Sequence, residues 1–299
     1  MPVLAYHANR VADNRYQGND HVALATDLRA LHEAGWRCVT LERVLDWHGG
    51  RRDDAALRRC FAVTFDDGSD FDYRDIDHPS CGVQRSLFNV LKDFGEEHGA
   101  EVHAASFVIA SPEARARLDA RCLVGRGWWN DDWWAEANAS GLMSIECHGW
   151  DHLHPVLDTV AQRDNLAGDF RRVATLEDCR RQLRDAAALI AARAGGRTPR
   201  FFAYPWGQYS DYLVADYLPS RREEHGFRAA FTTAPEPVRR SQDRWRLPRM
   251  VCGEAWRSPG ELLARVASAQ PPPTPSGREG QSARNAGPAS RSKRSRSAS

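Results

Sequence analysis

The chain has 299 residues, 42% of them hydrophobic, so it can form one large domain or two ordinary ones around a substantial core. Its 41 Lys and Arg residues nearly balance 40 Asp and Glu residues, and this net charge of +1 excludes whole-protein electrostatic attraction to nucleic acid. The seven cysteines are odd in number and form no C-x-x-C pair, which argues against a disulfide framework and against a structural zinc site.

Short apolar runs and amphipathic segments alternate along the chain. Runs rich in β-branched or aromatic residues predict strands at 3–6, 38–41, 61–65, 102–110, 142–147, 201–204, 228–232 and 245–251. Apolar residues spaced three or four apart predict helices at 21–34, 41–47, 86–97, 177–193, 211–225 and 258–267, and another that opens at Ser111 and Pro112. This alternation indicates parallel strands in an α/β barrel of seven or eight βα units.

Two segments between the predicted elements are unusual. The loop 69–79 is rich in acids, but their order does not match an EF-hand, so we expect a solvated or substrate-facing loop instead of a calcium site. The stretch 125–134 contains four tryptophans. Its rings, Trp128 and Trp129 among them, either stack on sugar faces or anchor a helix start capped by Asp131 or Asp132.

The two ends of the chain bear on domain organisation and location. Beyond residue 268 the composition changes to Pro, Ser, Gly and Arg, so we expect a barrel domain over 1–268 and a disordered basic tail over 269–299. No run of eighteen or more apolar residues is present, so no membrane span is expected. Residues 1–7 lack the features of a secretory signal, which predicts a cytoplasmic protein as the sequence stands, or an envelope protein if the start is truncated.

Ionisable residues follow two of the predicted strands. Asp66 and Asp67 end a buried apolar run, where a carboxylate is costly unless it is paired, hydrogen-bonded or bound to a metal. His148 and His152 follow the strand 142–147 and lie four residues apart. With one carboxylate they would make three protein ligands and leave open positions for water and substrate. The carboxyl ends of barrel strands share one rim, so we expect these residues to meet there.

These segments resemble the polysaccharide deacetylase family, metal-dependent N-deacetylases of chitin, peptidoglycan and related amino sugar polymers. The family's Thr-Phe-Asp-Asp-Gly motif is matched at 64–68, and its His-Ser/Thr-x-x-His motif at 148–152 with Gly149 in place of the hydroxyl residue. Its Pro-aromatic-Gly motif is matched at 205–207. The resemblance extends over roughly residues 3–255, and it implies the family's distorted (β/α)7-type barrel.

The resemblance also implies roles for individual residues. Asp66 would be the general base, and Asp67, His148 and His152 would bind a divalent metal, with zinc expected and cobalt or nickel as alternatives. The implied substrate contacts are Tyr204, Pro205 and Trp206, to which we add Trp128, Trp129 and His7.

Two parts of the family pattern are missing. No histidine follows His225, where the family has a Leu-x-His proton donor, so His154 is our first candidate for the general acid and His7 the second. Ala203 stands where an arginine would orient the base, and we expect Arg249 or Arg200 to reach the same carboxylate from another strand.

We therefore expect a metal-dependent hydrolase that releases acetate from N-acetylhexosamine units of a poly- or oligosaccharide. One alternative is a C–N hydrolase of a small amide or ureide, and a second is a non-catalytic, metal-containing carbohydrate-binding protein. Tryptophans lining an open groove would favour a glycan substrate, whereas a closed pocket with an arginine clamp would favour a small acid. The sequence does not indicate an oligomeric state.

Overall fold

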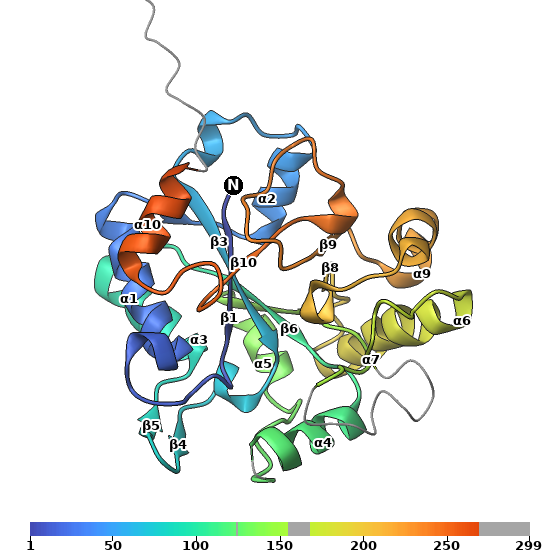
Figure 1. Ribbon diagram of the computed structural model, residues 1–299, viewed down its shortest axis with the longest axis horizontal. Helices are drawn as coiled ribbons and strands as arrows, with labels where there is room; N and C mark the ends of the chain where they lie inside the picture. Colours follow the sequence, from blue (N-terminus) through green and yellow to red (C-terminus); the bar gives the residue numbers. More distant parts are fainter. Residues whose placement is uncertain (124, 155–167, 269–299) are drawn as a thin grey trace, which may run out of the picture.

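The computed structural model describes residues 1–123, 125–154 and 168–268 (Figure 1). The predicted tail, 269–299, lies outside the described residues. No helix in the described ranges is long and apolar enough to cross a membrane.

A curled sheet of eight parallel strands forms the centre of the molecule. Seven strands follow the order β10-β1-β3-β6-β7-β8-β9, and β2 pairs with β3 beside this path. Their bounds are β1 Val3–His7, β2 Arg37–Cys38, β3 Cys60–Asp67, β6 Ala104–Val108, β7 Met143–Cys147, β8 Phe201–Ala203, β9 Ala229–Phe231 and β10 Met250–Val251. Leu247 forms a parallel bridge to Phe231, and Met250 pairs with Leu4, so the segment 247–251 connects the two ends of the sheet. The parallel barrel predicted from the alternation of elements is therefore confirmed.

Helices cover the outside of this sheet (Figure 1). They are α1 Asp20–Glu33, α2 Leu41–His48, α3 Leu87–His98, α4 Pro112–Cys122, α5 Trp134–Ala139, α6 Leu176–Cys179, α7 Ala186–Arg193, α8 Leu218–Ser220, α9 Arg222–His225 and α10 Pro259–Ser268. A π-helical turn at 180–185 joins α6 to α7, so the helix predicted over 177–193 is continuous. Ser111 begins α4 as predicted, because its Oγ accepts a hydrogen bond from the amide of Ala114 at 3.1 Å and Pro112 follows it.

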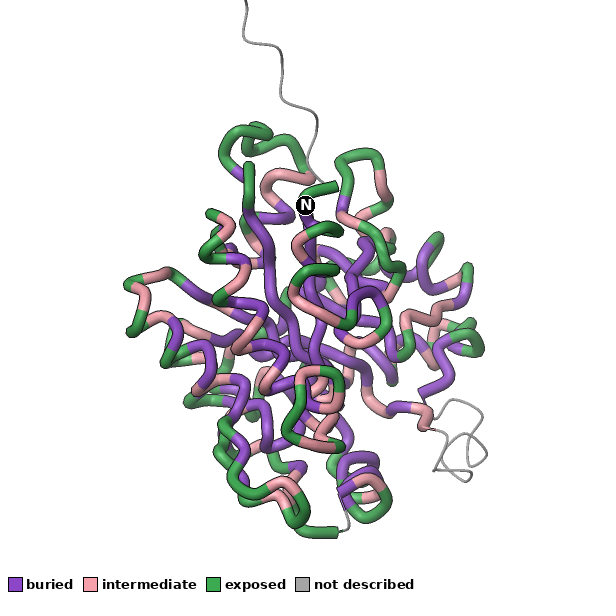
Figure 2. The backbone as a smooth tube through the Cα atoms, turned by 60° about the vertical axis from the view of Figure 1, so that its left-hand side comes forward, coloured by how far each residue is buried: buried purple, intermediate pink, exposed green. Residues whose placement is uncertain are grey.

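The strands bury both of their faces, as parallel strands covered by helices do. Side chains such as Val63, Phe65 and Ile145 pack outward against the helices. Ala62, Ala105 and Phe107 belong to a second cluster of buried residues, which lies on the opposite face of the same strands. Figure 2 shows the buried residues concentrated along these central strands, with exposed residues on the helices and outer loops. The sheet therefore provides a rigid base for the loops at its carboxyl ends.

The acid-rich loop differs from the prediction. Residues Ile76–His78 and Gly82–Gln84 form a small antiparallel hairpin, β4 and β5. Of the acids that precede it, Asp70 and Asp72 are buried instead of solvated, whereas Asp75 is exposed. Asp70 accepts hydrogen bonds from the backbone and side-chain nitrogens of Asn130 at 2.8 and 2.7 Å. Asp72 accepts one from Ser106 Oγ at 2.6 Å, on the neighbouring strand β6. The first part of the loop is thus packed into the core, because the carboxylates of Asp70 and Asp72 have partners there.

The helix after the tryptophan-rich stretch also starts differently. Neither Asp131 nor Asp132 caps α5, whose N-cap position is Trp133 without a side-chain hydrogen bond. Asp131 instead pairs with Arg115 at 2.6 Å, and Asp132 with Arg74 at 2.9 Å. The predicted strand 245–251 is also shorter, because Arg244–Arg246 form a 3-10 turn before β10.

Candidate metal and catalytic centre

The two adjacent carboxylates lie at the carboxyl end of β3. Asp66 is in register with His7 of β1 and with Phe107 of β6. Asp67, the last residue of β3, has a positive φ of 76°, which is rare for a residue with a side chain. Gly68 follows with φ 71°, and a Cβ at this position would lie 2.5 Å from Val108 Cγ1, so the turn requires glycine. The turn therefore begins at Asp67, one residue earlier than the glycine suggests.

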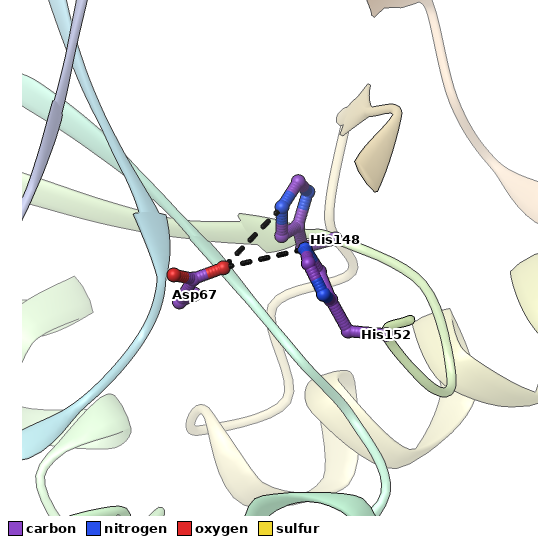
Figure 3. A group of neighbouring side chains, drawn as sticks. All are labelled: Asp67, His148 and His152. Atoms are coloured by element: carbon purple, nitrogen blue, oxygen red, sulfur yellow. Dashed lines mark ion pairs between the residues drawn. The ribbon is translucent and has the colours of Figure 1, made fainter. Parts of the chain in front are cut away.

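Asp67, His148 and His152 point toward one another above the rim of the sheet (Figure 3). Asp67 Oδ1 lies 3.7 Å from His148 Nε2 and 3.6 Å from His152 Nε2. Two ligands about 2.1 Å from one metal ion in a tetrahedral site are roughly 3.4 Å apart, close to both distances. Within the described ranges this is the one group of three or more His, Cys, Asp or Glu side chains that could hold a metal ion.

Neighbouring groups orient these side chains. His148 Nδ1 lies 2.8 Å from the carbonyl oxygen of Ala203, so this nitrogen carries the proton and the lone pair of Nε2 faces Asp67. Asn9 Nδ2 donates a hydrogen bond to Asp67 Oδ2 at 3.1 Å. Trp129 Nε1 donates another to the backbone oxygen of Asp67 at 3.0 Å. No sequence pattern points to Asn9, because its partner Asp67 lies 58 residues away in the chain.

The electrostatics of the three side chains suit a cation. Burial lowers the pKa of His148 and lowers the pKa of His152 to about 4, so both rings are neutral at pH 7. Burial raises the pKa of Asp67, but the neighbouring His152, His7 and His148 outweigh it and hold that pKa below its usual value. An ionised carboxylate and two neutral imidazoles thus direct lone pairs at one point, as a divalent transition metal requires.

Arg249 and Asp66 form an ion pair inside the barrel. Arg249 NH1 and NH2 lie 2.5 and 2.8 Å from Asp66 Oδ1 and Oδ2. Burial raises the pKa of Asp66, but Arg249 and then His148 outweigh it and hold the pKa well below its usual range. Of the two arginines considered from the sequence, Arg249 therefore orients this carboxylate. Arg200 instead pairs with Glu42, with 3.5 Å between Arg200 NH1 and Glu42 Oε1.

A cavity of about 450 Å³ opens over these residues. Its wall includes His7, Asn9, Arg10, Asp66, Asp67, His148, His152, His154, Trp206, Thr233 and the segment 251–254. Trp206 is 48% exposed, and its Nε1 donates a hydrogen bond to the carbonyl oxygen of Leu153 at 2.6 Å. The structure thus brings Trp206 and both candidate acids, His7 and His154, to one cavity.

Four of the predicted substrate contacts lie elsewhere. Within the described part of the chain, Trp128, Trp129, Tyr204 and Pro205 are not on the cavity wall. Tyr204 is fully buried, and its hydroxyl donates to the carbonyl oxygen of Trp245 at 2.8 Å. Trp129 is 5% exposed, whereas Trp128 is partly buried and contacts Phe71. Their positions in the sequence did not indicate that Trp129 and Tyr204 are buried side chains.

Gly149 has a structural reason to replace a hydroxyl residue. Its φ is 97°, and an added Cβ would lie 2.7 Å from Phe170 Cζ. Its amide donates to Cys147 Sγ at 3.4 Å and its carbonyl accepts from Ala110 N at 3.0 Å, so the backbone itself holds the turn that leads from His148 to His152.

Comparisons with known proteins agree with this fold. The family model described as polysaccharide deacetylase matches residues 53–220, more than half of the chain. No match was found among curated proteins.

Several solved structures share the fold. A Streptococcus pyogenes deacetylase, PplD, in complex with acetate, is 17% identical with a TM-score of 0.61 over 89% of this chain and 97% of that one. A de-N-acetylase from Aggregatibacter actinomycetemcomitans is 16% identical with a TM-score of 0.56 over 88% and 98%. IcaB from Ammonifex degensii is 21% identical with a TM-score of 0.51 over 90% and 95%.

Proposed function

The chain belongs to the polysaccharide deacetylase family of hydrolases, and on this premise we propose that it removes N-acetyl groups from N-acetylhexosamine units of a poly- or oligosaccharide with the help of a divalent metal. The observation that carries the proposal is the convergence of Asp67, His148 and His152 beside the paired carboxylate of Asp66. We assign the activity to residues 1–268 as one catalytic unit.

We propose that Asp67 Oδ1 and the Nε2 atoms of His148 and His152 hold the metal. An ion bound there would polarise the acetyl carbonyl as a Lewis acid and lower the pKa of a water molecule. The donor set of one carboxylate and two imidazoles suits zinc, and cobalt or nickel are alternatives.

Asp66 is the proposed proton acceptor for the attacking water. Its pKa lies well below the usual range, so the carboxylate is ionised at every working pH. Arg249 holds both of its oxygens, which fixes the direction in which Asp66 can accept a proton. Arg249 thereby acts through Asp66 as a positioning residue.

The departing amine needs a proton, and both candidate donors line the cavity. His154 was the first candidate from the sequence. The structure gives an argument for His7, which is in register with Asp66 on the adjacent strand and interacts electrostatically with both Asp66 and Asp67. We therefore propose His7 as the general acid and keep His154 as the alternative. Loss of turnover in His7→Gln with activity kept in His154→Gln would support this order, and the reverse result would contradict it.

The cavity wall favours a glycan over a small acid. Trp206 presents an exposed indole face, which complements the apolar C–H face of a sugar ring. Arg10, the arginine on the described wall, is engaged by Asp20 Oδ1 at 3.1 Å and by the carbonyl oxygens of Cys252 and Gln17 at 2.9 and 2.8 Å. Arg249 is occupied by Asp66. Neither guanidinium is therefore free to clamp a small carboxylate.

Acetate release from a panel of substrates tests the proposal. Zinc-loaded protein is incubated with N-acetylglucosamine oligomers of increasing length and, separately, with small amides and ureides. We expect acetate from the oligomers alone. Release of product only from small amides would overturn the choice of substrate, and glycan binding without any turnover would instead support a non-catalytic binding protein.

A further inference from the structure

Asp67 adopts a conformation that needs support. Its φ of 76° places an L-residue in the left-handed region, a conformation that costs about 1–3 kcal/mol and persists only where the surroundings enforce it. The same residue is the proposed anionic ligand, so any relaxation of its backbone would move Oδ1 away from the two imidazoles.

Two hydrogen-bond donors from distant segments hold this residue. Asn9, in the loop after β1, donates to its side-chain Oδ2 at 3.1 Å, which leaves Oδ1 facing His148 and His152. Trp129, between α4 and α5, donates to its backbone oxygen at 3.0 Å. The side chain and the backbone of Asp67 are thus fixed independently.

The segment that carries Trp129 is itself tightly bound. Arg115 NH1 donates to the carbonyl oxygen of Trp129 at 3.2 Å, and the buried Asp70 accepts from the amide of Asn130 at 2.8 Å. The amides of Gly127 and Trp128 both donate to the carboxylate of Asp119 at 2.9 Å. Trp129 is 5% exposed, so its indole N–H is held against the turn in a site that excludes water.

We propose that Asn9 and Trp129 are positioning residues for Asp67. The tryptophan-rich segment 125–134 then serves to hold the turn at Asp67 and Gly68 in place. This inference rests on the proposed metal site. Outer hydrogen-bond partners of metal ligands typically contribute a factor of about 10–100 to metal affinity. The effect is expected on metal binding itself, before any substrate is added.

The test is zinc binding by apo-protein, measured by competition with a chromogenic chelator. Asn9→Ala and Trp129→Phe each remove one donor, and each should bind zinc about 10–100-fold more weakly than the parent. Thermal unfolding of the apo forms, followed by circular dichroism, identifies folded variants. Because Asn9 is only partly buried, its variant remains informative if Trp129→Phe does not fold.

Two matched controls separate positioning from general packing. Trp134→Phe removes the same N–H from a fully buried ring whose Nε1 has no hydrogen-bond partner among the described residues. Asn14→Ala removes an amide that donates to the carbonyl oxygen of Cys81 at 2.9 Å, away from Asp67. Both controls should keep the parent's zinc affinity.

Parent-like zinc affinity in Asn9→Ala and in folded Trp129→Phe, or an equal loss in the controls, would overturn the inference and leave the proposed function standing. Failure of the parent to bind zinc, cobalt or nickel would instead overturn the metal site and this inference with it.

Discussion

Arg249 and Asp66 meet in the interior of the barrel although 183 residues separate them in the chain. Their side chains are 0% and 3% exposed, and both carboxylate oxygens accept a guanidinium N–H, at 2.5 and 2.8 Å. The same Arg249 NH1 also donates to Thr64 Oγ1 at 3.1 Å, which ties the pair to strand β3. The carboxylate proposed as proton acceptor is therefore charged and is oriented by one residue near the end of the domain, while it remains on the wall of the cavity.

Removing this arginine should destabilise the protein strongly. Arg249→Met leaves the buried charge of Asp66 without a partner, which we expect to lower the free energy of unfolding by about 3–5 kcal/mol. Urea denaturation measures the change. The same substitution in an Asp66→Asn background should cost clearly less, because no charge is then left unpaired. A similar cost in both backgrounds would show that the pair contributes packing alone.

Restoring the hydroxyl at Gly149 should also be destabilising. Gly149→Ser forces a side chain into a positive-φ position and against Phe170, at an expected cost of about 2 kcal/mol in unfolding free energy. Gly141→Ser is the matched control, since Gly141 has φ 77° but no atom within 4 Å of an added Cβ. Equal costs for the two variants would contradict the contact with Phe170.

A buried glutamate should make stability depend on pH. Glu146 accepts backbone N–H bonds from Arg200 and Phe201 at 2.7 and 2.9 Å, where β7 and β8 share one paired position, Cys147 with Phe202. Burial raises its pKa from 4.5 to about 7, so between these values the folded form keeps a proton that the unfolded chain releases. The contribution of protonated Glu146 to the free energy of unfolding is complete below pH 4.5 and is lost as the pH rises through about 7.

Glu146→Gln should remove this dependence, because the amide does not titrate. The free energy of unfolding of parent and variant is measured in urea from pH 5 to 8. Relative to the variant, the parent should become less stable by about 2–3 kcal/mol as the pH rises over this range. Parallel curves for the two proteins would contradict the raised pKa.

The exposed indole on the cavity wall should matter for substrate affinity. Trp206→Ala removes a sugar-stacking surface, so the KM for N-acetylglucosamine oligomers should rise about 3- to 10-fold with little change in kcat. Trp206→Phe should fall between parent and alanine variant. Trp47→Ala on α2 provides the control, since Trp47 is not on the described wall of this cavity. An unchanged KM in Trp206→Ala would exclude this ring from substrate binding.

Sequence alone predicted the parts of the site that follow strands. Asp66 and His148 stand directly after apolar runs, and parallel strands bring such positions to one rim. The partners of these residues were harder to infer. Asn9 and Trp129 reach Asp67 from loops 58 and 62 residues away, and no periodicity signals such contacts.

The errors have a common physical origin. Asp70 and Asp72 resemble solvated acids in the sequence, yet both are buried because Asn130 and Ser106 provide donors from other elements. Tertiary hydrogen bonds here override the usual preference of carboxylates for the surface. The positive φ of Asp67 could not be predicted either, because Gly68 alone is sufficient to predict a turn at this place in the sequence.

The measurement that tests the central claim most directly combines zinc content and acetate release in one preparation. The parent, Asp66→Asn and His148→Ala are loaded with zinc, dialysed, and assayed on an N-acetylglucosamine oligomer. We predict about one zinc per chain in the parent and in Asp66→Asn, little in His148→Ala, and acetate from the parent alone. A parent that retains zinc and releases no acetate, or His148→Ala protein that retains both zinc and activity, would contradict the account.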